Sequence, residues 1–322
     1  MPNGGIMTYE EILAERALTD ERLVVMTAEN RAAIRNLPEK LGDRFIDVGI
    51  AEATMVGAAA GLALRGRIPV LHALATFLTL RAFEFIRTDI GIPNLPVKLV
   101  GGVPGLLSDG NGPTHQAIED ISLMRGIPNM KVFTPADAHE LAAGIPAILD
   151  DASPWYIRFN ATAPATDHHE PFAIGRAEIF GDGDDVAIIT YGFMLREALV
   201  ARDVLAAEGI SSRVINLRTL KPIDVEAILA AADETILMVT VEDHFLSGGL
   251  YSIIGELFLK HRTMAPLLPI AFAERWFTPG RLEEVLVNEG LTGAQLAETI
   301  RRELISERTG SFHASRITSG MV

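Results

Sequence analysis

The stretch Phe45-Ile46-Asp47-Val48-Gly49-Ile50-Ala51-Glu52, which continues into a small-residue segment at 55–63, decides the class of fold. Its apolar first half predicts a strand, and the following run of Ala, Gly, Val and Met predicts a helix. One acid, Glu52, lies between them. Such surroundings give a carboxylate little water, and desolvation raises the pKa of a carboxyl group and favours the neutral acid. We therefore expect Glu52 to take part in proton chemistry; the alternative is an acid that complements the macrodipole at a helix start.

Apolar runs and helical periodicities alternate along the rest of the chain. In the first half they predict strands at 23–27, 68–74, 96–100, 130–133 and 155–159, with helices at 79–90 and 136–149. In the second half they predict strands at 186–192, 213–217 and 236–241, with helices at 195–208, 248–260, 279–286 and 292–304. This order predicts an α/β protein with mostly parallel sheets flanked by helices.

A segment without periodicity divides the chain into two domains. Residues 161–171 contain two prolines and the pair His168-His169, and they predict a linker. We expect one domain at 7–165, a second at 172–307, and a loose polar tail at 308–322. Gly181-Asp182-Gly183 is expected to form a surface hairpin turn.

Composition limits the classes of function. The net charge of −14 argues against nucleic acid as a partner, because polyanions would be repelled. No apolar run is long enough for a membrane helix, and the N-terminus has no secretory signal pattern. The absence of cysteine excludes disulfides and thiolate-bound metals and is consistent with a cytoplasmic location.

Three further segments accompany Glu52. Thr76-Phe77 places an aromatic ring just after a predicted strand, where parallel-sheet proteins bind ligands. Gly110-Asn111-Gly112-Pro113-Thr114-His115-Gln116 is a turn sequence. It puts His115 on a tight loop, where an imidazole is available for proton transfer near neutral pH; the alternative is a surface histidine at a helix start. The third segment is Ile127-Pro128-Asn129-Met130.

Together these motifs resemble the C-terminal half of transketolase, including its deoxyxylulose-phosphate synthase branch. The second half agrees, because the segments at 217–224 and 241–244 and the pair Gly248-Gly249 resemble the family's C-terminal domain. The resemblance extends from about residue 7 to residue 304. It implies a pyrimidine-binding domain followed by a transketolase C-terminal domain.

The resemblance implies thiamine diphosphate as cofactor and a role for several residues. The acid matching Glu52 hydrogen-bonds N1′ of the aminopyrimidine, and the proton shared there favours the imino form that removes the thiazolium C2 proton. The aromatic matching Phe77 stacks on the pyrimidine, and Leu80 lies where many relatives have a second aromatic ring. The histidine matching His115 contacts the substrate, and Glu29 falls near an acid that faces the thiazolium across the subunit interface.

The family's diphosphate and Mg²⁺ ligands are missing from this half. Relatives hold them with a Gly-Asp-Gly…Asn segment in a separate N-terminal domain, and no such segment precedes Glu52. The resemblance thus implies that this chain has no metal ligands and pairs with an N-terminal, diphosphate-binding subunit. We expect an α₂β₂ heterotetramer in which this chain dimerises through its second domain and through a helix containing Ala58, Ala59 and Gly61.

Departures from the family pattern concern the substrate. Asn111 replaces an aspartate that reads acceptor hydroxyls in relatives, and Asn160 replaces an arginine that grips the acceptor's phosphate. Arg158 is the remaining candidate for substrate binding; its alternative is a salt bridge at a strand end.

Four functions fit these observations to different degrees. The first is the β-type subunit of a split transketolase that transfers a two-carbon ketol unit from a ketose to an aldehyde. A synthase-like reaction and the β subunit of a 2-oxoacid dehydrogenase E1 component are alternatives, although His115 favours transketolase. A non-catalytic scaffold subunit is the remaining alternative.

Overall fold

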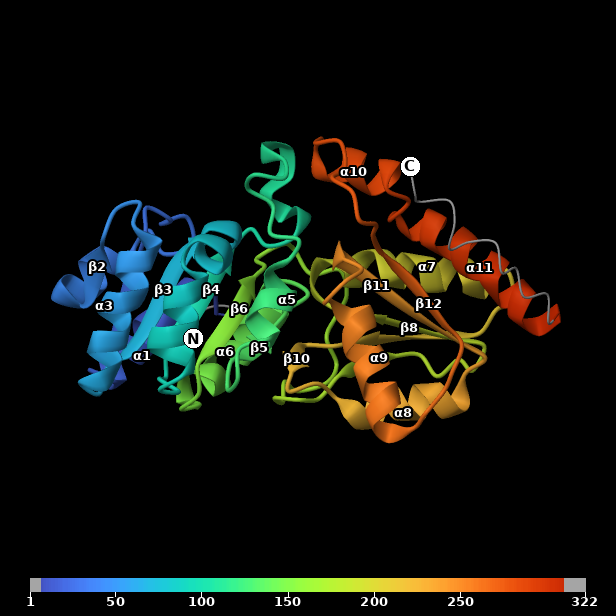
Figure 1. Ribbon diagram of the computed structural model, residues 1–322, viewed down its shortest axis with the longest axis horizontal. Helices are drawn as coiled ribbons and strands as arrows, with labels where there is room; N and C mark the ends of the chain where they lie inside the picture. The colour runs from blue at the N-terminus through green and yellow to red at the C-terminus, as the bar shows by residue number, and fades with distance from the viewer. Residues whose placement is uncertain (1–6, 310–322) are drawn as a thin grey trace, which may run out of the picture.

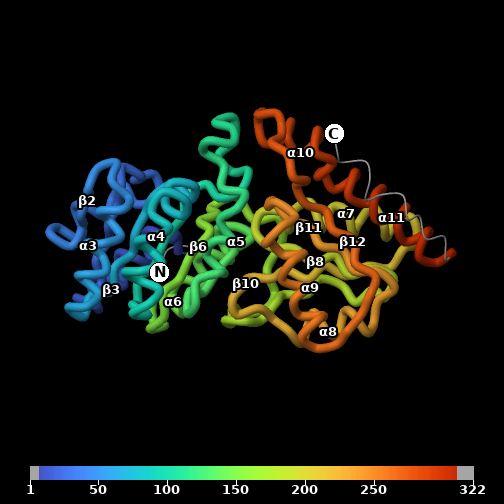
Figure 2. The backbone as a smooth tube through the Cα atoms, in the orientation of Figure 1, coloured from blue at the N-terminus to red at the C-terminus, as the bar shows by residue number. Residues whose placement is uncertain are grey.

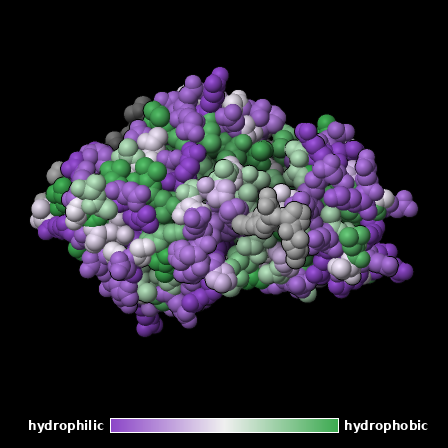
Figure 3. Space-filling model, turned by 180° about the vertical axis from the view of Figure 1, so that it is seen from behind, coloured by the Kyte–Doolittle hydropathy of each residue, from purple (hydrophilic) through white to green (hydrophobic). Residues whose placement is uncertain are grey.

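The computed structural model describes residues 7–309 as two α/β lobes that lie side by side along the long axis of the molecule (Figure 1). The smooth backbone trace shows the same two lobes and the central segment that joins them (Figure 2). Seen from behind, hydrophobic side chains are interspersed among polar ones and gather toward the upper middle of the face (Figure 3).

The first lobe is built on a seven-stranded sheet of order β10-β5-β6-β4-β3-β1-β2. All neighbours in it pair in parallel except β10 and β5, which are antiparallel. Its strands are β1 (Leu23–Thr27), β2 (Phe45–Asp47), β3 (Ile68–Leu74), β4 (Lys98–Gly102), β5 (Lys131–Phe133), β6 (Trp155–Phe159) and β10 (Thr219–Lys221).

Helices cover both faces of this sheet, as a buried parallel sheet requires. One face packs on α1 (Tyr9–Thr19), α2 (Leu37–Leu41) and α6 (Ala138–Asp150). The other packs on α3 (Glu52–Leu64), α5 (Asp120–Arg125) and the segment that contains α4 (Phe83–Phe85). That segment is not a regular α-helix, because π-helical turns at Phe77–Arg81 and Ile86–Gly91 flank α4.

The second lobe has a five-stranded sheet of order β12-β11-β8-β9-β7, antiparallel only at β7. Its strands are β7 (Glu178–Phe180), β8 (Val186–Thr190), β9 (Ser212–Asn216), β11 (Leu237–Phe245) and β12 (Leu267–Phe272). Its helices are α7 (Leu195–Ala207), α8 (Val225–Glu234), α9 (Leu250–His261), α10 (Leu282–Asn288) and α11 (Gly293–Thr309). The expected class of fold, two mostly parallel sheets flanked by helices, is therefore confirmed.

Two local expectations were wrong, and one strand crosses the expected boundary between the domains. Gly181-Asp182-Gly183 does not form a hairpin turn, because β7 pairs with β9 rather than with β8, the strand that follows the turn. Helix α11 continues to Thr309, so only residues 310–322 of the expected tail lie outside the described part of the chain. Strand β10 comes from the second half of the sequence but joins the sheet of the first lobe.

Buried charged pairs connect the two lobes. On β6, Arg158 donates through Nε to Asp120 Oδ2 at 2.9 Å and through Nη1 to Asp243 Oδ1 of β11 at 2.8 Å. All three side chains are at most 3% exposed. Tyr156 also donates to Asp120 Oδ2 at 2.6 Å. This network fixes the carboxyl ends of two strands, one from each lobe.

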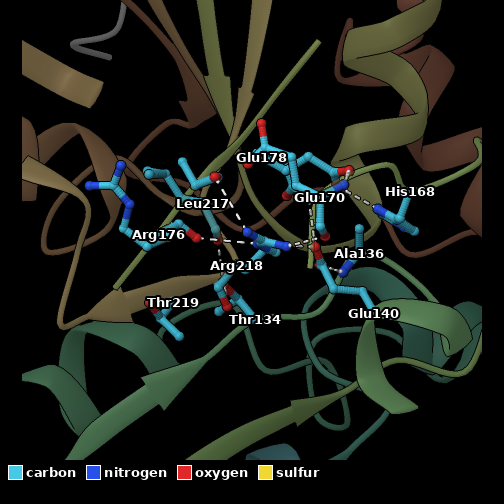
Figure 4. Close-up of polar contacts among 12 residues, drawn as sticks. Thr134, Ala136, Glu140, His168, Glu170, Arg176, Glu178, Leu217, Arg218 and Thr219 are labelled. Atoms are coloured by element: carbon cyan, nitrogen blue, oxygen red, sulfur yellow. Dashed lines mark hydrogen bonds and ion pairs between the residues drawn. The ribbon is translucent and has the colours of Figure 1, made fainter. Parts of the chain in front are cut away.

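A second junction surrounds the linker. His168 Nδ1 lies 2.6 Å from Glu178 Oε2, and Nε2 lies 2.8 Å from Asp137 Oδ2 at the start of α6. Burial would lower the pKa of His168, but the hydrogen bonds to the two carboxylates outweigh it and raise the pKa to about 10. The neighbouring Glu140 is buried, and its pKa is raised to about 7 by desolvation. Figure 4 shows Glu140, His168, Glu178 and Arg218 converging at this junction.

Candidate active site

Glu52 is the first residue of α3, and the structure buries it to 2% exposure. Strand β2 delivers the chain to the carboxyl edge of the sheet, and residues 48–51 then turn it into the helix. The expected burial is confirmed, and the structure adds a charged neighbour that the sequence did not predict. Arg81 Nη1 lies 3.2 Å from Glu52 Oε1 and 3.0 Å from Oε2, so one guanidinium group contacts both carboxylate oxygens.

Phe77 and Arg81 begin and end the first π-helical turn after β3. Their spacing of four residues puts them on one face of the helical segment. The Arg81 Cζ atom lies 4.4 Å from the centre of the Phe77 ring, a cation–π distance. Inserted π turns are frequent at functional sites, and here the turn places an aromatic ring and a guanidinium group beside the first residue of α3.

His115 meets this group from the Gly-Asn-Gly-Pro loop. Its ring centre lies 5.2 Å from that of Phe77 in an edge-to-face arrangement, and its Nδ1 lies 2.9 Å from Thr114 Oγ1. The second lobe supports the loop, since Leu282 N of α10 donates to Asp109 Oδ1 at 2.6 Å. Gly112 has φ +70°, and an added Cβ would lie 3.0 Å from Pro279. Figure 1 shows this loop projecting beside α10.

The structure thus gathers three of the sequence-predicted site residues. Glu52, Phe77 and His115 come from three separate segments, and Arg81 links the first two. We call these four side chains the rim cluster. It lies at the carboxyl edge of the parallel sheet, where open α/β sheets bind their ligands. A buried acid, an aromatic face and an imidazole can together bind a flat polar ring and move protons on it.

Sequence reasoning missed Arg81. Its signal was the spacing of four residues from Phe77, in a segment that was otherwise expected to be apolar and regularly α-helical.

Two other predicted residues lie outside these contacts. Leu80 is 44% exposed on the same π-helical turn. Glu29 is exposed just after β1, has φ +61°, and donates its backbone N–H to Asp47 Oδ1 at 3.5 Å. Neither makes a ring or ion-pair contact with the rim cluster within residues 7–309 of the structure.

The candidate substrate residues divide into an exposed one and two buried ones. Asn111 is exposed on the His115 loop and donates to Ser108 O at 2.8 Å. Arg158 is buried, and Asp120 and Asp243 occupy its guanidinium group, as in the salt-bridge alternative. Asn160 is also buried, and its amide donates to Ala136 O at 2.5 Å.

Within residues 7–309, one group of side chains has the composition of a metal site. Ligand atoms of Glu140, His168 and Glu178 lie within 4.8 Å of one another. Both ring nitrogens of His168 are already hydrogen-bonded to carboxylates, and Glu140 Oε2 accepts from Ala136 N at 2.6 Å. The geometry is that of a partly buried imidazolium between acids rather than that of a metal centre.

The fold and the rim cluster define a two-domain α/β protein whose first domain presents an acid, an aromatic ring and a histidine to a ligand. Comparison with protein families identifies this class. Residues 6–163 match the transketolase pyrimidine binding domain, and residues 175–296 match the transketolase C-terminal domain. The chain belongs to the transketolase family, to whose C-terminal half it corresponds, which confirms the resemblance inferred from the sequence.

Individual relatives point to separately encoded halves. The chain is 37% identical to a 6-deoxy-6-sulfo-D-fructose transketolase subunit of Clostridium sp. (strain MSTE9), over 90% of this chain and 91% of that protein. It is 34% identical to a putative transketolase C-terminal section of Methanocaldococcus jannaschii, over 93% of this chain and 96% of that protein. A solved structure described as "Split gene transketolase, inactive beta4 tetramer" matches with a TM-score of 0.83 and 34% identity, over 93% of this chain and 98% of its own.

Full-length relatives are about twice as long. A 1-deoxy-D-xylulose-5-phosphate synthase of Synechococcus sp. (strain JA-3-3Ab) is 38% identical over 91% of this chain, which covers only 46% of that enzyme. Among the helices of residues 7–309, none combines the length and the apolar character needed to cross a bilayer.

Proposed function

We propose that this chain is the β-type subunit of a split transketolase, which transfers a two-carbon ketol unit with thiamine diphosphate after pairing with an N-terminal subunit. The proposal rests above all on one observation: Glu52, Phe77 and His115 meet at the carboxyl edge of the sheet. A non-catalytic scaffold would not need these three groups to converge.

The side chains present fit the aminopyrimidine half of that cofactor. Glu52 and Phe77 already hold a flat, cationic nitrogen group, the Arg81 guanidinium, by a carboxylate contact and a ring contact. An aminopyrimidine protonated at N1′ has the same chemical character. When bound, the cofactor supplies the nucleophilic carbon that takes up the two-carbon unit.

Glu52 is then the residue that holds and moves the proton at N1′. Its burial at 2% exposure keeps bulk water away from that proton, so that proton transfer is confined to the ligand. Phe77 orients the pyrimidine by ring contact. His115, at the edge of Phe77, lies where it can bind a hydroxyl or carbonyl of the sugar.

Replacement of Glu52 by glutamine tests this assignment. The amide has nearly the same volume but cannot accept and return the proton. In the complex with the partner subunit, exchange of the cofactor's C2 proton, followed by NMR, should slow by at least about 10²-fold. Glu84→Gln, an exposed acid on α4, is the matched control. Unchanged exchange in Glu52→Gln would return Glu52 to a role at the helix start.

The partner requirement is a second part of the proposal. Mg²⁺ and the diphosphate would be bound mainly by the N-terminal subunit, and a cytoplasmic location belongs to the same proposal. Calorimetry on the lone chain with Mg²⁺ present should show no tight binding of thiamine diphosphate. Submicromolar binding by the lone chain would contradict the split site.

The proposed α₂β₂ assembly uses the outer face of α3. Ala58 and Gly61 are exposed there and would allow another helix to approach closely. Ala59 was expected in the same interface but is fully buried in the core of its own lobe. Light scattering on the co-expressed pair should show a heterotetramer, and a stable one-to-one heterodimer at micromolar concentration would oppose the assignment.

The acceptor is proposed to depend only weakly on a phosphate group. Asn160 carries no charge, and the buried Arg158 is already paired with aspartates, so neither can bind a phosphate group. A bidentate cation–anion contact is worth roughly 10- to 150-fold in binding. One relative is named for a sulfonated sugar, which supports a terminal group other than phosphate. The test compares kcat/KM for an aldose phosphate, the corresponding sulfonate and the free sugar. A preference for phosphate above about 10³-fold would exceed what this site can explain.

A synthase reaction is the second candidate, favoured by the 38% identity to 1-deoxy-D-xylulose-5-phosphate synthase. Supplying pyruvate and an aldose phosphate to the reconstituted enzyme distinguishes the two. Carbon dioxide release without ketol transfer from a ketose would replace the leading proposal.

A further inference from the structure

Arg81 lies between the two side chains proposed to hold the cofactor's pyrimidine. Its Nη1 contacts both oxygens of Glu52, at 3.0 and 3.2 Å, and its Cζ lies 4.4 Å from the centre of the Phe77 ring. The Arg81 guanidinium is planar and contacts both Glu52 and Phe77. Another planar ligand of these two residues would need the same contacts.

The guanidinium group and a protonated aminopyrimidine share the features that such a site recognises. Both are flat, both carry delocalised positive charge, and both present N–H donors along one edge. A carboxylate accepts such donors strongly, and an aromatic face attracts such cations. Glu52 and Phe77 therefore offer the same two contacts to either group.

We propose that Arg81 is an internal substitute for the cofactor's aminopyrimidine, and that it must leave Glu52 before thiamine diphosphate binds. This inference rests on the proposed function. In the cofactor-free chain, Arg81 then pairs with the buried carboxylate of Glu52. The cofactor must displace it, so the strength of this pair affects the affinity for the cofactor.

The exposure of Arg81 makes this exchange possible. Its side chain is 51% exposed, whereas that of Glu52 is 3% exposed. Released from Glu52, the guanidinium group moves fully into water, where hydration compensates for the lost ion pair. Arg158, at 3% exposure between two buried aspartates, has no such route.

Binding of thiamine diphosphate to Arg81→Gln tests the competition. The chain is mixed with its diphosphate-binding partner and Mg²⁺, and the dissociation constant is measured by equilibrium dialysis. Removing a contact of this kind should tighten binding by about 2- to 5-fold, because the fraction of sites ready to bind rises. Arg81→Lys, which keeps the charge but not the flat group, should lie between the wild type and Arg81→Gln. Arg87→Gln, an exposed arginine on the same segment, is the matched control and should bind as the wild type does.

The outcomes separate this inference from the function on which it rests. Weaker or unchanged binding by Arg81→Gln would overturn the competition, and weaker binding would make Arg81 a cofactor-retaining residue instead. Binding by neither the wild type nor any variant would reject thiamine diphosphate itself, and the inference with it.

A measurement on the lone chain checks the contact directly. In side-chain NMR of ¹⁵N-labelled arginine, the Arg81 signal should move in Glu52→Gln, whereas the Arg87 signal should not. An unmoved Arg81 signal would show that the ion pair does not form, which removes the basis for competition.

Discussion

Two buried carboxylate regions of this molecule pair with arginine in opposite ways. At the lobe junction, Asp120, Asp243 and Arg158 are all at most 3% exposed. In the rim cluster, Glu52 is 3% exposed in its side chain, but its partner Arg81 is 51% exposed. The acids are equally buried, and the arginines are not.

The difference separates a structural ion pair from a binding site. A charge pair buried on both sides has no way back to water, so losing one partner leaves an uncompensated buried charge. A pair with one exposed member exchanges that member for solvent or for another ligand at little cost. A buried acid is therefore available for chemistry when its arginine partner is exposed. Burial of the acid alone does not distinguish the two cases.

The largest expected effect comes from breaking the junction. Arg158→Met should lower the free energy of unfolding by about 3–5 kcal/mol, because Asp120 and Asp243 lose their shared cation. Arg81→Met should lower it by only about 0–1 kcal/mol, the range of exposed pairs. Urea unfolding of the two variants measures both. Equal losses would contradict the distinction drawn between the two regions.

A smaller loss of stability is expected at the linker junction, where His168 pairs with two carboxylates. His168→Gln should lower the free energy of unfolding by about 1.5–3 kcal/mol, because the imidazolium donates to the buried carboxylates of Asp137 and Glu178. The neighbouring His169 is 53% exposed, so His169→Gln is the matched control and should change little. If the two variants were equally stable, the linker would not be held by His168.

The pH dependence sharpens the same point. The pKa of His168 is raised from 6.5 to about 10, since its hydrogen bonds to Asp137 and Glu178 outweigh the opposing effect of burial. The stabilisation from a raised pKa is complete at pH values below the pKa of the unfolded chain. It is lost as the pH rises through the pKa of the folded chain. The stability difference between wild type and His168→Gln should thus be full at pH 6 and should shrink as the pH approaches 10. Thermal unfolding across that range measures it, and a difference that grows with pH would have the wrong sign.

Local sequence was sufficient for the elements that depend on local patterns. Strands β1, β3 and β6 have the predicted bounds, because each is a mainly apolar run that polar or turn-forming residues precede and follow. Strand β10 was not predicted, because three residues carry no period and their partner strand belongs to the other lobe.

The site shows the same division between local and distant information. Glu52, Phe77 and His115 were predicted from their motifs, and the structure brings them together. The sequence left Arg158 as either a substrate ligand or a salt bridge, because its partner Asp243 lies 85 residues away; the structure shows the salt bridge. Arg81 was missed because its pairing with Glu52 spans 29 residues and depends on a π turn.

The smallest expected effect concerns the loop that carries His115. Asp109 accepts a hydrogen bond from Leu282 N of α10 at 2.6 Å, so the second lobe helps to hold a loop of the first. Asp109→Ala removes this bond and should lower the free energy of unfolding by only about 0.5–1.5 kcal/mol. The Phe77–His115 contact depends on the same loop, so in the reconstituted enzyme KM for the sugar should rise more than the affinity for thiamine diphosphate falls. Asp182→Ala, which removes an exposed acid from the segment between β7 and β8, is the control. If Asp109→Ala weakened the cofactor and the sugar equally, the loop would support the whole rim cluster rather than His115 alone.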